Sequence, residues 1–203
     1  MLNGAEWRLA DRDRPETESG DPDLEILRRI GAGDGAACAL LVDRHLRRVT
    51  ALAGHMLGNR ADAEDVAQEV FLRVWKQAPK WRSGEAKFST WLHRVTLNLC
   101  TDRLRRRRET GLDTVGDMAS DAPLPDAGLQ ETAIVTRVQA ALAQLPERQR
   151  EAILLCHFQE LGNIEAAAVL ELSVEALESL LSRGRRRLRE LLLEERPDLT
   201  GST

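Results

Sequence analysis

The sequence predicts an all-α fold: two small helical domains joined by a flexible linker, with the C-terminal domain ending in a helix-turn-helix. Leu, Ala and Val supply most of the apolar content, aromatic residues make up 3% and Tyr is absent, which favours packed helices. Apolar residues recur at helical spacing over residues 21–109 and again over residues 132–195. Residues 110–131 lose this periodicity and gain Gly, Pro and acidic side chains, so we expect a flexible acidic linker there.

The two ends of the chain are polar, and we expect residues 1–20 and 196–203 to be disordered tails. No apolar run approaches the roughly 18 residues that a membrane-spanning helix needs. The first residues also lack the apolar core of a signal peptide. We therefore expect a cytoplasmic protein with no membrane insertion.

Two helices open the first domain. Leu24, Leu27 and Ile30 lie on one side of a short helix that the glycines at 31 and 33 end. A longer helix follows and stops at Gly58. Its side facing the core is expected to carry Ala37, Leu40, Leu41, Leu46, Val49, Leu52 and Met56.

Two further helices complete this bundle. Asn59 can cap the third helix, with Asp62 three residues later as a possible capping-box partner. The fourth helix is expected from about Phe88 to Arg108, with Trp91 among its inward-facing residues. Four consecutive helices with short connections describe a compact helical bundle.

The second domain resumes helical periodicity near Ile134 and keeps it to about Leu193. Pro146 marks a helix N-terminus, because proline suits a first helical turn. Residues 163–189 indicate two short helices joined by a tight turn, with Ser173 placed to cap the second helix. The inward-facing positions of this helix-turn-helix are Ala167, Leu170, Leu172, Leu177 and Leu181.

The helix-turn-helix predicts DNA binding, because its second helix can enter a major groove. Five arginines near its end can reach phosphates beside that groove: Arg183, Arg185, Arg186, Arg187 and Arg189. The net charge of −4 is nevertheless unusual for a protein that holds DNA by itself, since affinity depends on releasing counterions from phosphates. We therefore expect another molecule to hold this chain on DNA.

The third helix of the first domain has two sides of different character. Val66, Val70 and Val74 form an apolar stripe. The opposite side is acidic and interrupted by Leu72: Asp62, Asp65, Gln68, Glu69, Leu72 and Lys76. It is interpreted either as an ordinary solvated face or as a docking surface for a basic partner.

The segment 79–108 combines a loop tryptophan with a basic helix. Trp81, Arg82 and Lys87 lie in or beside the loop, and the helix after it ends in a run of arginines. Such a combination suits unstacked bases, because aromatic rings stack on bases while cations follow the backbone. The alternative is structural: Trp91 belongs to the core, and the arginines complement the dipole at the end of their helix.

Cys38, Cys100 and Cys156 are far apart and odd in number, which favours buried thiols in a reducing compartment. Two alternatives are a thiol redox sensor and an enzyme that uses Cys156 with His157. We expect neither, and we expect no catalytic residue, cofactor or metal site, because no metal-ligand set, phosphate loop or nucleophile–base pair is visible.

The chain resembles a bacterial extracytoplasmic-function (ECF) sigma factor. The resemblance rests on the ordered segments DAEDVAQEVFLRVW, FSTWLHRVTLNLCTDRLRRRR, LPERQREAILL and the terminal helix-turn-helix, and it covers about residues 22–193. It implies a region 2 domain at 21–109 and a region 4 domain at 132–195. A sigma factor has no catalytic residues of its own; it binds RNA polymerase core and selects promoters.

The resemblance also implies partners and contact residues. RNA polymerase core, at the clamp of its largest subunit and the flap of its second, would be one partner; promoter DNA and an anti-sigma factor would be others. Core-binding positions would be Asp62, Asp65, Gln68, Glu69 and Leu72. Residues for opening and reading the −10 element would be Trp81, Arg82, Lys87, Asn98, Asp102, Arg103 and Arg106. Residues for the −35 element would be Glu175, Glu178, Ser179, Ser182, Arg183 and Arg186.

The recognition helix departs from the family pattern. Many members have Gly where this chain has Glu171 and Glu175, and Lys or Arg where it has Glu178. A glutamate repels phosphate, but it can accept a hydrogen bond from the amino group of cytosine. A conventional helix-turn-helix repressor or activator that binds duplex DNA as a dimer is the rival reading, and it leaves residues 62–108 without a role.

Overall fold

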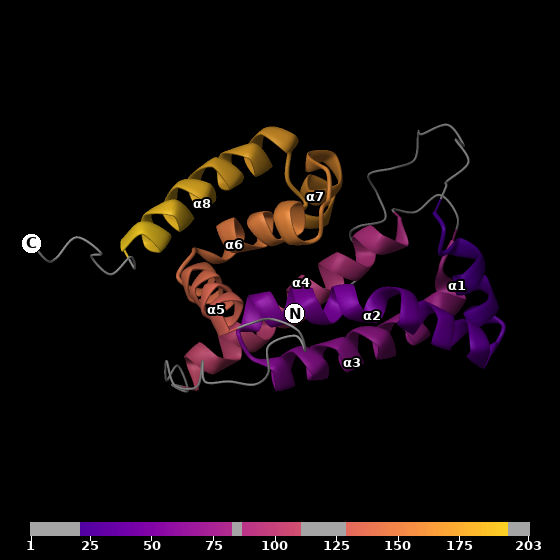
Figure 1. Ribbon diagram of the computed structural model, residues 1–203. Helices are drawn as coiled ribbons and strands as arrows, with labels where there is room; N and C mark the ends of the chain where they lie inside the picture. Colours follow the sequence, from indigo (N-terminus) through magenta and orange to yellow (C-terminus); the bar gives the residue numbers. More distant parts are fainter. Residues whose placement is uncertain (1–20, 83–86, 111–128, 195–203) are drawn as a thin grey trace, which may run out of the picture.

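The computed structural model describes residues 21–82, 87–110 and 129–194, and these residues form helices without any strand (Figure 1). The first domain holds α1 (Leu24–Gly31), α2 (Gly35–Leu57), α3 (Arg60–Gln77), the short 3-10 helix η2 (Ala78–Lys80) and α4 (Phe88–Glu109). The second holds α5 (Leu129–Ala143), α6 (Glu147–Ile153), the π-helical turn η3 (Leu154–Phe158), α7 (Asn163–Leu170) and α8 (Val174–Glu194). The expected tails and most of the expected linker lie outside the described residues.

Local signals set the helix ends of the first domain. The Asp34 carboxylate accepts hydrogen bonds from the backbone N–H groups of Ala36 and Ala37, and α2 ends at Gly58 in the left-handed region at φ 66°. Asn59 caps α3 by accepting from the N–H of Asp62, as predicted. The Asp62 carboxylate, however, pairs with arginines of α4, which the local pattern could not reveal.

The core face of α2 was predicted with two errors. Leu41 and Leu52 are each 1% exposed, but Leu40 and Leu46 are 50% and 43% exposed. His45, which the apolar pattern passed over, occupies a core position and is 6% exposed. A stripe at 3.6 residues per turn runs through positions 41, 45, 49 and 52, which turns Leu40 and Leu46 outward.

The helix-turn-helix was predicted correctly. The Ser173 hydroxyl accepts from the Ala176 N–H at 3.2 Å and caps α8. Glu171 ends α7 in the left-handed region at φ 56°, a conformation that glycine adopts more readily. The predicted inward residues are buried except Leu172, which is half-buried: Ala167, Leu170, Leu177 and Leu181.

Gly184 lets α8 approach α6 closely. A Cβ atom at this position would lie 2.9 Å from Ile153 Cδ1 and 3.3 Å from Gln149 Cβ. A side chain at this position would therefore require the Ile153 side chain or α8 itself to shift. The lack of a side chain at Gly184 allows α8 to pack at its observed distance from α6.

The start of the second domain differs from the prediction. Helix α5 begins at Leu129, inside the range expected to be linker, and its predicted beginning near Ile134 was too late. Pro146 directly precedes α6, in agreement with the predicted N-terminus. The π-helical turn η3 after α6 carried no sequence signal.

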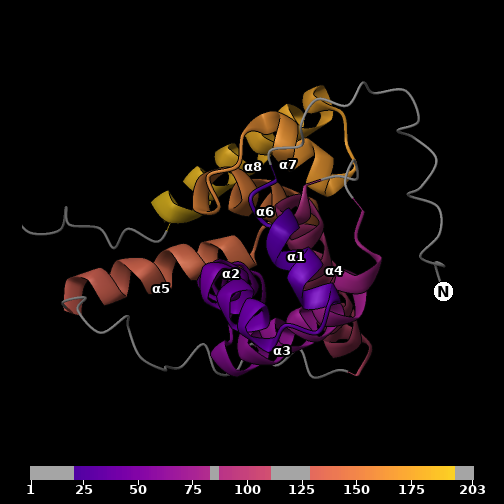
Figure 2. The ribbon, with the colours of Figure 1, turned by 90° about the vertical axis from the view of Figure 1, so that its right-hand side faces the viewer.

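The two domains pack against each other. Helix α7 contacts α4 and α5 contacts α2, so that the helix-turn-helix lies over the first domain (Figures 1 and 2). Hydrogen bonds stabilise the contact between the domains: Gln139 Nε2 donates to the carbonyls of Gly54 and His55 at 3.2 and 3.0 Å. Gln159, which is 6% exposed, donates to the Arg48 carbonyl at 3.3 Å.

Candidate nucleic-acid interface

The predicted docking face of α3 lies on the surface. Asp65, Gln68 and Leu72 are exposed, with Leu72 at 45%, and Trp75 beside them is 39% exposed. Glu69 is half-buried and pairs with Arg73 at 3.0 Å. The face therefore combines carboxylates with two large apolar side chains, a composition suited to a protein partner.

Arg103 joins this face to α4. Its Nε lies 2.9 Å from Asp62 and its NH2 group 2.7 Å from Asp65, while Arg107 also pairs with Asp62. The sequence assigned Arg103 to the −10 element and the two aspartates to core binding. The structure brings these three residues together in one ion-pair network.

Trp81 belongs to an aromatic cluster that the sequence did not reveal. Its ring packs edge-on against Phe88 and Trp91, with centroids 5.5 and 5.7 Å away, and Phe88 stacks on Trp91 at 5.8 Å. Phe88 is only 1% exposed, so the cluster anchors the start of α4 in the core. The loop residues 83–86 lie outside the described residues, with Arg82 and Lys87 exposed on either side.

The outer side of α4 carries the other residues predicted for the −10 element. Asn98 and Arg106 are exposed, and neither side chain has a hydrogen-bond or ion-pair partner in the described part of the chain. Asp102 is half-buried and accepts from Arg105 at 3.0 Å. These side chains are accessible to a nucleic-acid strand along α4.

The six residues predicted for the −35 element share one exposed stripe of α8. They occur at alternating steps of three and one residues, the spacing of a single helix face: Glu175, Glu178, Ser179, Ser182, Arg183 and Arg186. Asn163 Nδ2 donates to Glu178 Oε1 at 3.2 Å and orients that carboxylate. Hydrogen bonds from the Glu175 backbone and from Ser173 lower the pKa of Glu175, which is therefore ionised at neutral pH.

Two cations of the first domain hold α7. Arg94 donates to the carbonyls of Ala168 and Val169 at 2.6 and 3.3 Å, and it pairs with Glu171 at 2.7 Å. These carbonyls lie in the last turn of α7, where a helix lacks internal donors and its dipole attracts cations. Lys87 pairs with Glu165 at 2.8 Å. The second domain thus covers the beginning of α4.

His93 is a buried titratable group at this contact. Its Nδ1–H donates to the Ser89 carbonyl at 2.7 Å, and its Nε2 lies 3.4 Å from Gln159 Oε1. Burial lowers the pKa of His93, and the nearby charges of Arg48 and His45 act in the same direction. The imidazole is therefore neutral in the packed arrangement.

Burial disfavours the reactive thiolate form of two of the three cysteines. Burial raises the pKa of the Cys100 thiol to about 12 and also raises that of Cys156. His157 accepts a hydrogen bond from Arg185 Nε at 3.1 Å and so is engaged away from Cys156. Protonated thiols are poor nucleophiles, which argues against a reactive role for Cys100 and against an enzyme that uses Cys156 with His157.

Comparisons with known proteins match both halves of the chain. Residues 41–110 match the model of Sigma-70 region 2, and residues 136–188 match that of Sigma-70, region 4. The ECF RNA polymerase sigma factor SigW of Bacillus subtilis is 30% identical over 177 residues, covering 82% of this chain and 94% of the relative. The chain belongs to the ECF sigma factors.

A second relative of this sigma factor is longer. The ECF RNA polymerase sigma factor SigE of Mycolicibacterium smegmatis is 35% identical over 156 residues, which is 75% of this chain and 60% of that protein. ECF sigma factors direct RNA polymerase to promoters, and they are regulatory specificity subunits. The resemblance inferred from the four sequence segments is confirmed.

Solved structures agree with the fold. CnrH in complex with the cytosolic domain of CnrY superposes with a TM-score of 0.68 at 28% identity, covering 87% of this chain and all of CnrH. The sigma factor RpoE of Bartonella quintana, in complex with the anti-sigma factor NepR, gives a TM-score of 0.63 at 25% identity, covering 78% of this chain and 98% of RpoE. Within the described residues of this sigma factor, none of the helices has the length and apolarity to cross a membrane.

Proposed function

We propose that this sigma factor binds the clamp of the largest polymerase subunit through α3 and contacts the flap of the second subunit through its region 4 domain. The acidic face of α3, with Asp65, Gln68 and Leu72 exposed in the segment that matches region 2, carries the first part of this proposal. A basic clamp surface would complement these carboxylates, and Leu72 and Trp75 would supply apolar contact area. Polymerase lies in the cytoplasm, so we place the protein there.

For the −10 element, we infer that the loop between Trp81 and Lys87 receives a base extruded from the non-template strand. Extrusion costs a few kcal/mol, which contacts in the receiving pocket offset. Asn98, Asp102 and Arg106 lie along the outer side of α4 and would contact the strand. Arg103 would act chiefly by holding α4 on α3, because both of its partners are α3 carboxylates.

For the −35 element, α8 would lie in the major groove with its exposed stripe toward the bases. Arg183 and Arg186 would contact phosphates or guanines, and Ser179 and Ser182 would contact the backbone or base edges. Glu178, oriented by Asn163, would accept a hydrogen bond from a cytosine amino group. Each domain would bind promoter DNA weakly by itself. The two domains together would bind more tightly because they are on one chain and because polymerase contributes further contacts with DNA.

The packed arrangement also bears on regulation. Because Glu165 and the end of α7 cover the beginning of α4, simultaneous reading of both promoter elements requires the domains to separate. RpoE of Bartonella quintana is described in complex with an anti-sigma factor. We infer that an anti-sigma factor controls this chain by stabilising an arrangement in which the DNA faces are covered.

Transcription in vitro tests the function. Core polymerase is incubated with fragments of the native genome, with and without the full-length protein, and the transcript starts are mapped. Promoter-specific transcripts must depend on the added protein. Transcripts that start at the same sites with core alone would refute the proposal, and tight dimeric binding to duplex DNA without core would favour the repressor reading.

The docking face has its own test. Asp65→Arg and Gln68→Ala should both weaken binding to core, with the charge reversal giving the larger loss because it places like charges together. Glu25→Arg, on α1 and away from the proposed face, is the matched control. Full activity and core affinity in both α3 variants would overturn this assignment of α3.

A further inference from the structure

Glu171 adopts a backbone conformation that favours glycine. It ends α7 at φ 56°, and the N–H of Leu172 after it donates back to the Ala167 carbonyl at 3.0 Å. Helices that end in this way usually have glycine at the position of Glu171, because a Cβ atom crowds the backbone there. A glutamate therefore strains the backbone at this position. Such strain is found mainly at functional positions.

The Glu171 side chain acts across the contact between the domains. It is exposed, and its carboxylate Oε1 lies 2.7 Å from NH1 of Arg94 on α4. Among the residues that the structure describes, this carboxylate has no other hydrogen bond or ion pair. The described part of its own domain therefore offers no reason for a glutamate at this strained position.

Arg94 uses each nitrogen of its guanidinium on the end of α7. NH1 pairs with Glu171, NH2 donates to the Ala168 carbonyl, and Nε donates to the Val169 carbonyl. Both carbonyls belong to the last turn of α7, where a helix has no internal donors for them. A planar guanidinium with three acceptors fixes orientation as well as position. One side chain therefore holds the end of α7 on α4.

A second cation holds the beginning of α7. Lys87 Nζ lies 2.8 Å from Glu165 Oε1, and this hydrogen bond raises the pKa of Lys87 and lowers that of Glu165. Lys87 and Arg94 are about two helical turns apart, so they lie on one side of α4. Two ion pairs therefore hold α7 along that side of α4, one near each end of α7.

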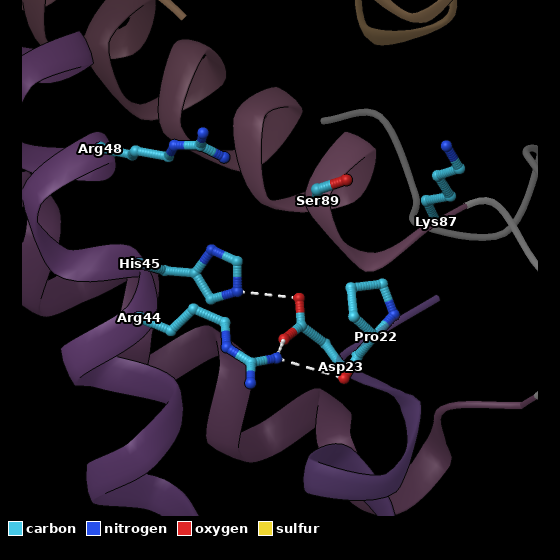
Figure 3. A pocket seen from close by; sticks show the side chains of 7 residues that line it. All are labelled: Pro22, Asp23, Arg44, His45, Arg48, Lys87 and Ser89. Carbon is cyan, nitrogen blue, oxygen red and sulfur yellow. Dashed lines mark hydrogen bonds and ion pairs between the residues drawn. The ribbon is translucent and has the colours of Figure 1, made fainter. Parts of the chain in front are cut away.

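Lys87 is available to the second domain because carboxylates near it in its own domain are already bonded. Lys87 and Arg48 line a cavity of about 550 Å³ between α2 and the beginning of α4 (Figure 3). In this cavity Asp23 is bonded by His45 Nε2 at 2.8 Å and by an arginine of α2. Asp21 accepts from two backbone N–H groups at 3.0 and 2.7 Å.

We propose that the ion pair between Glu171 and Arg94 is an intramolecular latch, which keeps the free sigma factor closed until it binds core polymerase. The partner of this end of α7 is therefore the first domain of the same chain. The proposal rests on the function proposed above and adds that the chain closes without an anti-sigma factor. Reading two promoter elements at once requires the latch to break, and polymerase supplies the free energy by binding each domain at its own site.

Energy transfer between two dyes measures the open fraction of the free full-length protein. The dyes are attached at position 47 of α2 and position 190 of α8, which are both exposed. Glu171→Gln keeps the size of the side chain and removes its charge, so it should raise the ratio of open to closed molecules about threefold. Arg94→Ala also releases the two α7 carbonyls and should raise this ratio about tenfold.

Glu160 provides a matched control for backbone strain. It is also an exposed glutamate in the left-handed region, at φ 57°, but its side chain has no partner in the described ranges. Glu160→Gly and Glu171→Gly relieve the same kind of strain, and only Glu171→Gly should increase the open fraction. Equal opening in the two glycine variants, or an unchanged open fraction in Glu171→Gln, would overturn the proposal.

A double-mutant cycle and salt assign the effect to the ion pair. In Arg94→Ala, the further substitution Glu171→Gln should change nothing, because the partner is already absent. The difference between wild type and Glu171→Gln should largely disappear at about 1 M salt, which screens exposed charges. A difference that persists in either experiment would assign the opening to other contacts of α7.

Association with core polymerase tests the inhibitory role of the latch. Glu171→Gln should bind core about threefold faster, because a larger fraction of its molecules is already open. Promoter-specific transcription at saturating protein should stay at the wild-type level, which also shows that the variant is folded. An unchanged association rate despite a larger open fraction would refute inhibition by the latch. Failure of the proposed function would be distinct: wild-type protein would give no promoter-specific transcripts, whatever the dyes report.

Discussion

The two predicted DNA surfaces of this sigma factor are built in different ways. The stripe on α8 comes from one regular helix, and all six of its residues are exposed. The surface around α4 is composite: Arg103 pairs with carboxylates of α3, Arg94 contacts α7, and Trp81 packs against Phe88 and Trp91 of α4. Helical periodicity predicts which residues share one face of a single helix. The residues of a composite surface can be predicted only when the packing of its helices is known.

The composite surface should be the more sensitive to a single core substitution. Phe88→Ala removes the ring that joins His45, Trp81 and Trp91 at the start of α4. The loss should be about 3–5 kcal/mol of unfolding free energy, measured by urea denaturation. Ile164→Ala, at a position 77% exposed, should change stability by less than about 0.5 kcal/mol. Equal effects of the two variants would show that the ring does not anchor the surface.

The regular surface on α8 should be most sensitive to substitution where α8 packs against α6, at Gly184. Gly184→Val introduces atoms where a Cβ already lies 2.9 Å from Ile153 Cδ1. We expect a loss of about 1–3 kcal/mol, seen as a lower midpoint in thermal unfolding. Gly35→Ala, where a Cβ would meet no atom within 4 Å, is the control and should not destabilise. Normal stability of Gly184→Val would mean that α8 has freedom to shift on α6.

The contact between the two surfaces depends on Arg94. Arg94→Ala leaves the last carbonyls of α7 and the Glu171 carboxylate without their cation, and we expect about 1–2 kcal/mol less stability of the packed arrangement. Small-angle scattering should show a larger radius of gyration. Arg28→Ala, which breaks an exposed ion pair within α1, should leave the radius unchanged. An unchanged radius in Arg94→Ala would remove Arg94 from domain packing.

Acidification should loosen the same contact through His93. Because burial lowers its folded-state pKa below the ordinary value of 6.5, the folded protein binds fewer protons than the unfolded chain just below that pH. Stability should therefore be full above pH 6.5 and decline as pH falls through this value toward the lowered pKa. Urea unfolding between pH 7.5 and 5.5 measures the slope, which His93→Gln should reduce. An identical slope in His93→Gln would assign the pH dependence to other groups.

The smallest effect concerns the orientation of one side chain on the regular surface. Asn163→Ala removes the hydrogen bond to Glu178 and should cost about 0.5 kcal/mol of discrimination at the base that Glu178 contacts. Competition between promoters that differ at single −35 positions measures this change. Glu178→Gln should alter preference at the same base, and effects of the two variants at different bases would contradict the pairing.

Much of the fold could be predicted because its signals are local. Asn59, Ser173 and Pro146 marked helix starts correctly, and Gly58 marked a helix end. The residues of the exposed α8 stripe were expected from the family resemblance, and helical periodicity places them on one face. Leu40 and Leu46 were misplaced because an apolar residue beside the core stripe looks the same in sequence as one within it.

The sequence by itself therefore determined the helices, the family and the residues of the α8 stripe, since caps, periodicity and motif order act within a few turns of one another. Only the tertiary structure decided that Arg103 faces Asp62 and Asp65, that Trp81 joins Phe88, and that Arg48 lines a cavity with Lys87. Those contacts join residues far apart in the chain, and side-chain chemistry alone does not specify which partner each will meet. The geometry of helix packing does.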